Sequence, residues 1–496
     1  MTTSNHNQTV LKGIQEIKTF FKENKTPIYF ISATNFNLLG MDEWVSNFKY
    51  ISHIDSYEGL HLNLFSPKEE VPHPEFTSIE DINNYLLTHP EVIDYINSQK
   101  VAGENSKALF LMFDATTEAL TKTLSMDLCF PASDLRTSLD NKVNTNRIAA
   151  KAGVACVPNV LSKVENYEHL CKVSKGLGTD LVIQTPFGDS GHTTFFITDE
   201  VTYDVHASEI EAEEEVKIMK RINCYGTAIE GCVTQHGTIV APLMTELVGF
   251  KELTPYKGGW CGNEIYPNAF TEEIRNKAKI YTQRFGDQLR EEGYKGYFEL
   301  DYLIDQDSKE VYLGELNPRV SGVSSLTNHS KFAMLDVPLF LFHLLEWMEI
   351  PYEIDTAALS NRWAEAVNMD SWSQLVVKHT YKTLELATAV PASGIWEMKN
   401  NGNIRFKKMD THRQAVLGDN EAFFIQITQK DDYIYEGADL GILVLRGRLM
   451  SDAFEISSRA KRWIKALRSH YKSEILDMSA LSEEDLAELQ EGFKLG

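Results

Sequence analysis

With 496 residues and a mass of 56.3 kDa, the chain is too long for one simple domain, and at ~150 residues each it predicts about three. Its 48 Lys and Arg residues against 71 Asp and Glu residues give a net charge of −23, which excludes nucleic acid and anionic membranes as main partners because both bind basic surfaces. Hydrophobic residues make up 43% of the chain, which excludes general disorder.

The N-terminal sequence MTTSNHNQTV is polar and lacks the apolar stretch of a signal peptide. No apolar run approaches the ~20 residues that span a bilayer. The six cysteines are scattered without a C-x-x-C pair, which is typical of reduced, mostly buried thiols. We therefore expect a soluble cytoplasmic protein.

The N-terminal part alternates helical patterns with short apolar strands. A helix is predicted over 11–22, and Pro27–Ala33 and Ala108–Phe113 are typical of buried strands. A helical pattern at 116–124 and a short strand at 128–130 follow. This alternation predicts a parallel α/β unit over residues 1–130.

The middle part, residues 131–350, mixes strands with longer helices. It opens with a capped helix at 138–152 that ends at Gly153. An acidic helix is predicted at 208–221 and a long amphipathic one at 270–292. Strands are predicted at 181–184, 193–197, 227–233, 238–244, 296–304 and 310–316, the last two joined by a turn at 305–309.

Residues 351–496 have a different composition and predict a separate α+β domain. Four strand-like stretches precede helical patterns at 452–470 and 481–490, the second with a capping motif at Ser482. The strand-like stretches lie at 375–381, 404–409, 422–428 and 440–447. The whole chain is thus predicted to be an α/β and α+β multidomain protein.

The stretch 296–317 carries the clearest chemical signal. Strand alternation places Glu299 and Asp301 on one face of the first strand, and Glu315 and Asn317 on one face of the second. If the two strands pair through the short turn, Asp301, Glu315 and Asn317 converge. Such oxygen ligands suit Mg²⁺. The alternative is that these are solvent-facing strand residues without a ligand.

The sequence GELNPR at 314–319 resembles the second metal strand of the ATP-grasp superfamily, which carries an E-x-N pattern often followed by Pro and Arg. Asp301 matches the first metal acid of that superfamily. Residues 138–158 are similar to the motif that opens the ATP-grasp domain, with Lys142 as its phosphate-contacting lysine. Residues 188–194 look like the glycine-rich loop over the phosphates. Residues 228–233 lie where the adenine hinge would be, with backbone groups of Glu230 to Cys232 reading the base.

The resemblance implies an ATP-grasp fold between an N-terminal parallel α/β (pre-ATP-grasp) domain and a C-terminal α+β domain, with ATP and Mg²⁺ (or Mn²⁺) bound. Its metal ligands would be Asp301, Glu315 and Asn317. Arg319 would be catalytic, with a planar fork for the substrate carboxylate or its acyl phosphate; alternatively it partners a metal-site acid. The implied nucleotide contacts are Lys142, Gln184, Gly188, Ser190, Gly191, His192, Glu230 and Cys232.

Two departures from the superfamily pattern affect the functional hypothesis. Gln184 stands where most members have a second lysine for the α-phosphate, a charge-assisted contact worth ~1.5–3 kcal/mol. Either His192 or Lys251 compensates, or nucleotide affinity is reduced. The closest resemblance, which includes residues 433–467, is to the biotin carboxylase branch; that branch carries Gln and a catalytic Glu where this chain has Ser321 and Val323. Biotin carboxylation is therefore not expected.

Several other residues are open between two interpretations. The stretch 253–267 either shapes a substrate pocket, with Tyr256 or Trp260 as walls, or is a structural loop. Glu246, Lys251 and His329 are either substrate contacts or ordinary polar groups.

The leading functional hypothesis is an ATP- and Mg²⁺-dependent carboxylate–amine ligase of the amino acid or peptide type. It would act through an acyl phosphate, release ADP and phosphate, and form a carbon–nitrogen bond between small-molecule substrates. The alternatives are a biotin carboxylase-like enzyme that activates bicarbonate, and a nucleotide-binding protein without turnover. The oligomeric state is open, although the resemblance is to a commonly dimeric branch.

Overall fold

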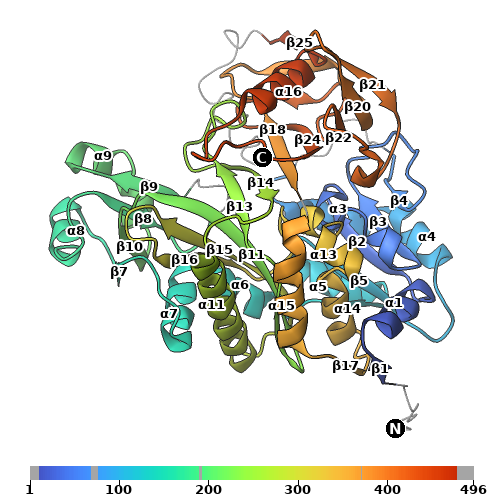
Figure 1. Ribbon diagram of the computed structural model, residues 1–496, viewed down its shortest axis with the longest axis horizontal. Helices are drawn as coiled ribbons and strands as arrows, with labels where there is room; N and C mark the ends of the chain where they lie inside the picture. Colours follow the sequence, from blue (N-terminus) through green and yellow to red (C-terminus); the bar gives the residue numbers. More distant parts are fainter. Residues whose placement is uncertain (1–9, 69–75, 189–192, 370, 477–496) are drawn as a thin grey trace.

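The computed structural model describes residues 10–68, 76–188, 193–369 and 371–476 (Figure 1). Near the N-terminus, a five-stranded parallel sheet has the order β4-β3-β2-β5-β6. Its strands are β2 (Ile28–Ser32), β3 (Phe48–Ser52), β4 (Leu64–Phe65), β5 (Ser106–Phe110) and β6 (Met126–Leu128). The helices of this part are α1 (Ile14–Lys22), η1 (Phe36–Leu38), α2 (Met41–Trp44), α3 (Ile79–Thr88), α4 (Pro90–Ser98) and α5 (Ala115–Thr123). The predicted parallel α/β unit is confirmed.

A small antiparallel sheet follows, with the order β7-β10-β8-β9. Its strands are β7 (Asn159–Ser162), β8 (Leu181–Gln184), β9 (Thr194–Ile197) and β10 (Val216–Lys220). One face packs on α8 (Tyr167–Val173), α9 (Glu200–Asp204) and α10 (Ala207–Glu211) through an apolar core that includes Ile183 and Ile218. Because side chains alternate along a strand, Gln184 and Lys217 point to the other face.

An eleven-stranded sheet runs through the rest of the molecule, with the order β16-β15-β11-β13-β14-β18-β24-β22-β20-β21 and β12 paired to β11. Its strands up to residue 317 are β11 (Cys224–Thr234), β12 (Gly237–Val240), β13 (Met244–Val248), β14 (Trp260–Ile265), β15 (Gly296–Asp305) and β16 (Val311–Asn317). Those beyond it are β18 (Trp372–Lys378), β20 (Gly394–Met398), β21 (Ile404–Lys408), β22 (Glu421–Gln426) and β24 (Asp439–Arg446). The antiparallel pair β14–β18 joins the two groups.

Helices cover these sheets and connect the parts. α11 (Glu272–Glu291) contacts β11, β12 and α7 (Lys142–Ala152), over a core of its own. The remaining helices are α6 (Ser133–Asp140), α12 (Ser324–Thr327), α13 (Lys331–Leu335), α14 (Phe340–Trp347), α15 (Thr356–Ala366), η2 (Val367–Met369), η3 (Arg413–Ala415) and α16 (Ser458–Arg468). The remaining strands are β1 (Leu11–Lys12), β17 (Tyr352–Glu353), β19 (Glu385–Ala389), β23 (Tyr433–Ile434) and β25 (Lys472–Ile475). In the described part of the chain no helix has the length and apolar character needed to span a membrane.

Three predicted elements differ from the structure. The acidic helix over 208–221 is wrong: α10 ends at Glu211 and 216–220 form strand β10, because Val216 and Ile218 alternate into the core of the small sheet. The strand predicted at 238–244 is two strands, β12 and β13. The helix over 138–152 is divided at Asn141, whose side chain accepts hydrogen bonds from the amides of Val143 and Asn144 and starts α7.

The proposed domain boundaries stay predictions. The parallel sheet ends at Leu128, close to the predicted boundary at 130. By contrast, the large sheet continues across the boundary at 350 through β14 and β18. The helix predicted at 481–490 lies outside the described residues.

Candidate functional site

The β15–β16 hairpin brings the predicted metal ligands together. Asp301 lies directly opposite Glu315, and Glu299 lies opposite Asn317. The turn is closed by Asp305, whose Oδ1 accepts hydrogen bonds from the amides of residues 307 and 308 at 2.8 and 3.2 Å. Asn317 Nδ2 donates to Glu299 Oε2 at 3.0 Å and to Asp301 Oδ2 at 3.4 Å. The three predicted ligands thus share one face of one hairpin.

Two further acids join this face, and we call Glu246, Glu299, Asp301 and Glu315 the acid cluster. Glu246 comes from β13, where Gly226 of β11 leaves it room: a Cβ at that glycine would lie 3.0 Å from Glu246 Oε2. Burial, reinforced by the charges of Asp301 and Glu315, raises the pKa of Glu246 well above its usual value. The sequence-based interpretation left this residue between substrate contact and ordinary polar group.

The close, mostly buried carboxylates of the acid cluster favour the binding of a cation. Burial raises the pKa of Asp301 to about 6, with Glu315 adding repulsion, and burial also raises the pKa of Glu299 well above its ordinary range. Carboxylates this close can all be ionised only when a positive charge joins them. Carboxylate oxygens and an amide oxygen are the ligands that Mg²⁺ takes, so the residues fit that ion.

Lys142 lies beside the acid cluster at the start of α7. Its Nζ is 3.2 Å from Glu315 Oε1 and donates a hydrogen bond to the carbonyl oxygen of Gly188. Gly188 has a φ of 130°, and a Cβ there would collide with Thr193 at 2.2 Å, so only glycine fits this bend. Lys142, Gly188 and Glu315 therefore meet between the small and the large sheet. Ser190, Gly191 and His192 lie outside the described residues.

The side of the small sheet that faces away from its apolar core carries a lysine that the sequence-based interpretation missed. Gln184 of β8 and Lys217 of β10 are direct cross-strand neighbours. Lys217 is 1% exposed, and its Nζ donates to the carbonyl oxygen of Gly314 at 3.0 Å, next to Glu315. Burial lowers the pKa of Lys217, against the attraction of Cys156 and Glu315. A lysine therefore lies on the strand next to Gln184, whereas Lys251, proposed above to compensate, is an exposed residue.

Arg319 lies at the edge of the acid cluster. Its Nε is 4.0 Å from Asp140 Oδ2, and its Nη1 donates to the carbonyl of Val320 at 3.4 Å. Its charge also favours the ionised forms of Glu299 and Asp301 and so acts to lower their pKa values. Arg319 therefore lies close enough to Glu299 and Asp301 to influence their ionisation, and its role toward a substrate stays a prediction.

The adenine hinge predicted at Glu230 and Cys232 is wrong. The backbone of this part of β11 pairs with β15 on one side and with β12 on the other, so its amides and carbonyls are not open to a base. The Glu230 carboxylate is buried, where it accepts a hydrogen bond from Tyr297 Oη at 2.5 Å, and burial raises its pKa to about 7. The Cys232 side chain is fully buried as well.

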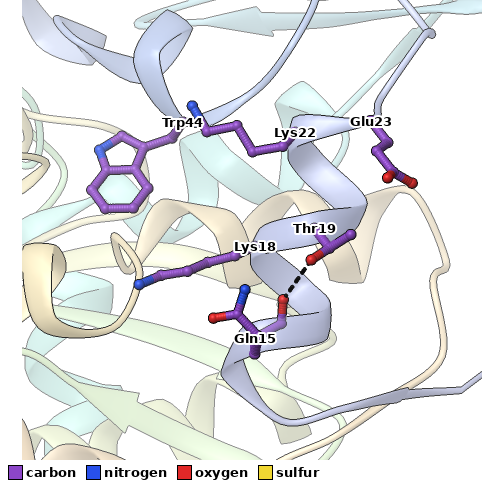
Figure 2. A pocket seen from close by; sticks show the side chains of 6 residues that line it. All are labelled: Gln15, Lys18, Thr19, Lys22, Glu23 and Trp44. Carbon is purple, nitrogen blue, oxygen red and sulfur yellow. Dashed lines mark hydrogen bonds between the residues drawn. The ribbon is translucent and has the colours of Figure 1, made fainter.

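The stretch 253–267 is structural over much of its length, because 260–265 form β14. The Trp260 ring packs on Gly322, where a Cβ would lie 2.3 Å from it, and its Nε1 donates to Asn263. Tyr256 packs on Gly437 and donates to the carbonyl of Glu436 at 3.1 Å. A pocket beside α1 (Figure 2) shares no residue with the acid cluster; it is lined by Gln15, Lys18, Thr19, Lys22, Glu23 and Trp44.

The sequence matches no family model and no curated protein at a significant level. The structure, in contrast, is similar to several solved structures. One is carboxyaminoimidazole ribonucleotide synthase from Aspergillus clavatus complexed with ATP, with a TM-score of 0.55 and 12% identity over 90% of this chain and 99% of that chain.

Two biotin carboxylases are also similar. The biotin carboxylase domain of the Hydrogenobacter thermophilus 2-oxoglutarate carboxylase, a dimer in complex with MgADP and bicarbonate, has a TM-score of 0.57 and 9% identity over 91% of each chain. Biotin carboxylase from Campylobacter jejuni has a TM-score of 0.56 and 12% identity over 90% of this chain and 92% of that chain. These likenesses cover nearly the whole length of both partners. The chain therefore has the ATP-grasp fold of these solved structures, with a parallel α/β part before it and an α+β part after it.

Proposed function

We propose that this chain is an ATP- and Mg²⁺-dependent ligase that activates a small carboxylate and joins it to an amine. The observation that carries the proposal is the convergence of Asp301, Glu315 and Asn317 with Lys142 between two sheets of an ATP-grasp fold. In this reaction a carboxylate oxygen attacks the γ-phosphorus and ADP leaves. The amine then attacks the acyl carbon of the acyl phosphate, phosphate leaves, and the amine loses a proton.

Asp301, Glu315 and Asn317 would hold the metal. Mg²⁺, or Mn²⁺ with its similar preference for oxygen ligands, supplies positive charge at the β- and γ-phosphate oxygens when bound. Lys142, which is 3.2 Å from Glu315, would contribute a second, fixed positive charge to the phosphates. The metal ion and Lys142 would thereby supply the positive charge that stabilises the ionised carboxylates of the acid cluster, whose pKa values are raised without it.

Lys217 would supply the positive charge that is missing because position 184 is a glutamine and not a lysine. It is held next to Glu315 by its bond to the carbonyl oxygen of Gly314, and it is one strand away from Gln184. The base would lie at the connection 221–223, which joins the small sheet to the large one. Within it, the amide of Arg221 donates to Asp180 and the carbonyl of Asn223 accepts from Gln306, so the backbone of Ile222 would have to read the base. This location replaces the hinge predicted on β11.

Arg319 would bind the substrate carboxylate or the acyl phosphate through its planar guanidinium group. Its contact with Asp140 fixes the approach of the side chain from the α6 side. By analogy with the dimeric biotin carboxylase domain, a homodimer is part of the proposal.

The test is a screen of amino acids and small carboxylates in pairs with amines, scored by ADP release and by the mass of the product. ADP release is expected only when acid, amine and Mg²⁺ are all present, and Glu315→Ala should abolish it. The matched control is Glu310→Ala, an exposed acid near the turn of the same hairpin. Turnover that survives Glu315→Ala, or that ignores the substrates, would contradict the proposal.

A second candidate is a bicarbonate-activating enzyme. The fold likeness to the bicarbonate complex of a biotin carboxylase domain favours it. Ser321 and Val323 weigh against it, since neither side chain can act as a base for bicarbonate, and both are buried. ADP release that depends on bicarbonate alone would support this candidate over the ligase.

A further inference from the structure

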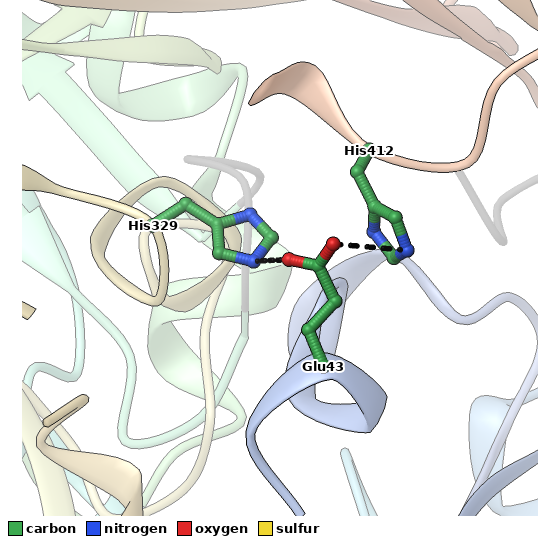
Figure 3. A group of neighbouring side chains, drawn as sticks. All are labelled: Glu43, His329 and His412. Atoms are coloured by element: carbon green, nitrogen blue, oxygen red, sulfur yellow. Dashed lines mark ion pairs between the residues drawn. The ribbon is translucent and has the colours of Figure 1, made fainter. Parts of the chain in front are cut away.

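Three side chains from distant parts of the sequence converge away from the acid cluster, and we call them the Glu-His-His group. Glu43 comes from α2, His329 follows α12, and His412 precedes η3 (Figure 3). Glu43 Oε2 is 2.7 Å from His329 Nε2, and Glu43 Oε1 is 3.5 Å from His412 Nε2. The potential ligand atoms all lie within 4.8 Å of one another. Both rings thus direct the same nitrogen toward one carboxylate.

His329 is held in place by close packing and by its contact with Glu43. Gly40, at a φ of 81°, lies against the ring, and a Cβ there would be 2.1 Å from His329 Cε1. Asn328 ties the same segment to the α2 region, because its carbonyl accepts from Trp44 Nε1 at 3.0 Å and its Nδ2 donates to the carbonyl of Leu39 at 3.4 Å. The His329 side chain is 0% exposed.

One nitrogen of the buried His329 ring, Nδ1, has no hydrogen-bond partner among the described residues. The other, Nε2, lies 2.7 Å from Glu43 Oε2, within hydrogen-bond distance. A buried polar atom without a hydrogen bond costs about 1–3 kcal/mol. Nε2 instead faces a carboxylate oxygen, and a cation bound between them would replace the proton that these two atoms share.

The other two members of the group leave one side open to solvent. The Glu43 and His412 side chains are 34% and 18% exposed. His412 is fixed by its amide, which donates to Asp410 Oδ1 at 3.2 Å, and Glu43 also accepts from Gln414 Nε2 at 3.4 Å. Water can therefore reach the centre of the group and supply a fourth ligand.

We propose that Glu43, His329 and His412 form a binding site for a zinc-type divalent cation. Two imidazole nitrogens and one carboxylate are a ligand set that Zn²⁺ takes in proteins, with water completing a tetrahedron. Bond lengths of about 2.0–2.2 Å place tetrahedral ligand atoms roughly 3.3–3.6 Å apart. Glu43 Oε1 and His412 Nε2 are 3.5 Å apart, which already fits this range. Glu43 Oε2 and His329 Nε2 are 2.7 Å apart and would have to separate by less than roughly 1 Å.

The charges around the group come from several elements. Lys22 of α1 donates to the carbonyl of Glu43, and Arg413 lies beside His329 with its guanidinium 4.7 Å above the Trp372 ring. On the opposite side, Asp42 lies 3.9 Å from His61, whose ring is 6.3 Å from His412. The site therefore has a carboxylate nearby to balance part of the positive charge.

The bound ion would connect the N-terminal part, the segment after the β15–β16 hairpin and the C-terminal part. Glu43 precedes strand β3 of the parallel sheet, His329 lies twelve residues after Asn317 (329 − 317), and His412 follows β21. The site shares no residue with the acid cluster. It would thus act as a tie between three parts of the chain and not as the ion of phosphoryl transfer.

The test is titration of the purified full chain with Zn²⁺ by calorimetry and with Co²⁺ by visible absorption, both in excess Mg²⁺ to occupy the acid cluster. One equivalent should bind, with the visible bands of tetrahedral Co²⁺ and without the intense near-ultraviolet band of Co²⁺–thiolate bonds. His412→Ala should lower the affinity by more than roughly 100-fold, because removal of a ligand exceeds the 10–100-fold effect of outer partners.

Glu43→Gln is the second variant and should have the same effect, which guards against a folding defect in one of the two. The matched control is His206→Ala, a partly exposed histidine 3.3 Å from Glu209 outside the group. Zn²⁺ should raise the melting temperature of the wild type and of His206→Ala but not of His412→Ala. No Co²⁺ spectrum, a thiolate band, or unchanged affinity in both variants would overturn the proposal.

Discussion

Replacement of Lys217 by methionine tests whether this lysine supplies the charge that Gln184 lacks. Methionine keeps the length and apolar stem of the side chain and removes only the ammonium group. Lys217 is 1% exposed and reaches Gly314, beside the predicted metal ligand Glu315. A charge-assisted contact in such a site is worth about 1.5–3 kcal/mol, which predicts a 10- to 150-fold increase in the Kd for Mg·ADP.

The assay is calorimetric titration with Mg·ADP, which needs no knowledge of the other substrates. Lys220→Met is the matched control, because Lys220 is on the same strand but is exposed and points to the opposite face. Gln184→Lys in the Lys217→Met background should restore much of the affinity, since the two positions are direct cross-strand neighbours. A circular dichroism spectrum excludes misfolding from the loss of the bond to Gly314. A Kd within about twofold of the wild type, with no rescue, would refute the reasoning.

Four further outcomes are expected. Asp301→Asn should stabilise the metal-free chain by about 1 kcal/mol or more in chemical denaturation with EDTA, because it removes a carboxyl whose pKa is raised to about 6, and it should abolish Mg²⁺-dependent ADP release. The pKa of Glu230 is about 7 in the folded chain, against 4.5 for an ordinary Glu, so its contribution to stability should fall as pH rises from about 4.5 to about 7. In Glu230→Gln, the free energy of unfolding should decrease by up to ~3 kcal/mol less over this pH range. A pH profile of urea midpoints identical to that of the wild type would contradict this expectation. Gly40→Ala should destabilise the chain by about 2 kcal/mol or more and weaken Zn²⁺ binding, since its Cβ would meet His329 at 2.1 Å; a wild-type melting temperature would argue against this packing. A chain ending at residue 350 should lack a cooperative thermal transition, because β14 loses its partner β18; a sharp transition would instead support 351–496 as a separate domain.

The β15–β16 hairpin could be predicted because its signal is local. Strand alternation and a five-residue turn suffice to place Asp301 opposite Glu315, and the register has this arrangement. Glu246 could not be predicted in the same way, because it reaches the cluster from β13, which pairs with β11 and not with the hairpin. Only the three-dimensional order of strands brings it there.

Lys217 and the hinge were missed for two different physical reasons. The glutamates at 211–215 favour a helical interpretation, and they hid the alternation of Val216 and Ile218 that marks β10. The hinge was misplaced because strand character does not reveal which backbone groups are already paired: β11 has neighbours on both sides at Glu230. The Glu-His-His group joins residues that are hundreds of positions apart, and no local pattern links them.

The continuity of the large sheet brings the C-terminal part into contact with the segment that follows Arg319. Gln374 of β18 donates to the carbonyl of Gly322 at 2.8 Å and accepts from Ser325 at 2.7 Å. Gly322 itself is covered by the Trp260 ring from β14. The segment that follows Arg319 is therefore fixed by strands from both sides of residue 350. If Arg319 recognises the substrate carboxylate, as proposed, it must be held in place before the substrate arrives, and strands of the C-terminal part would contribute to that support.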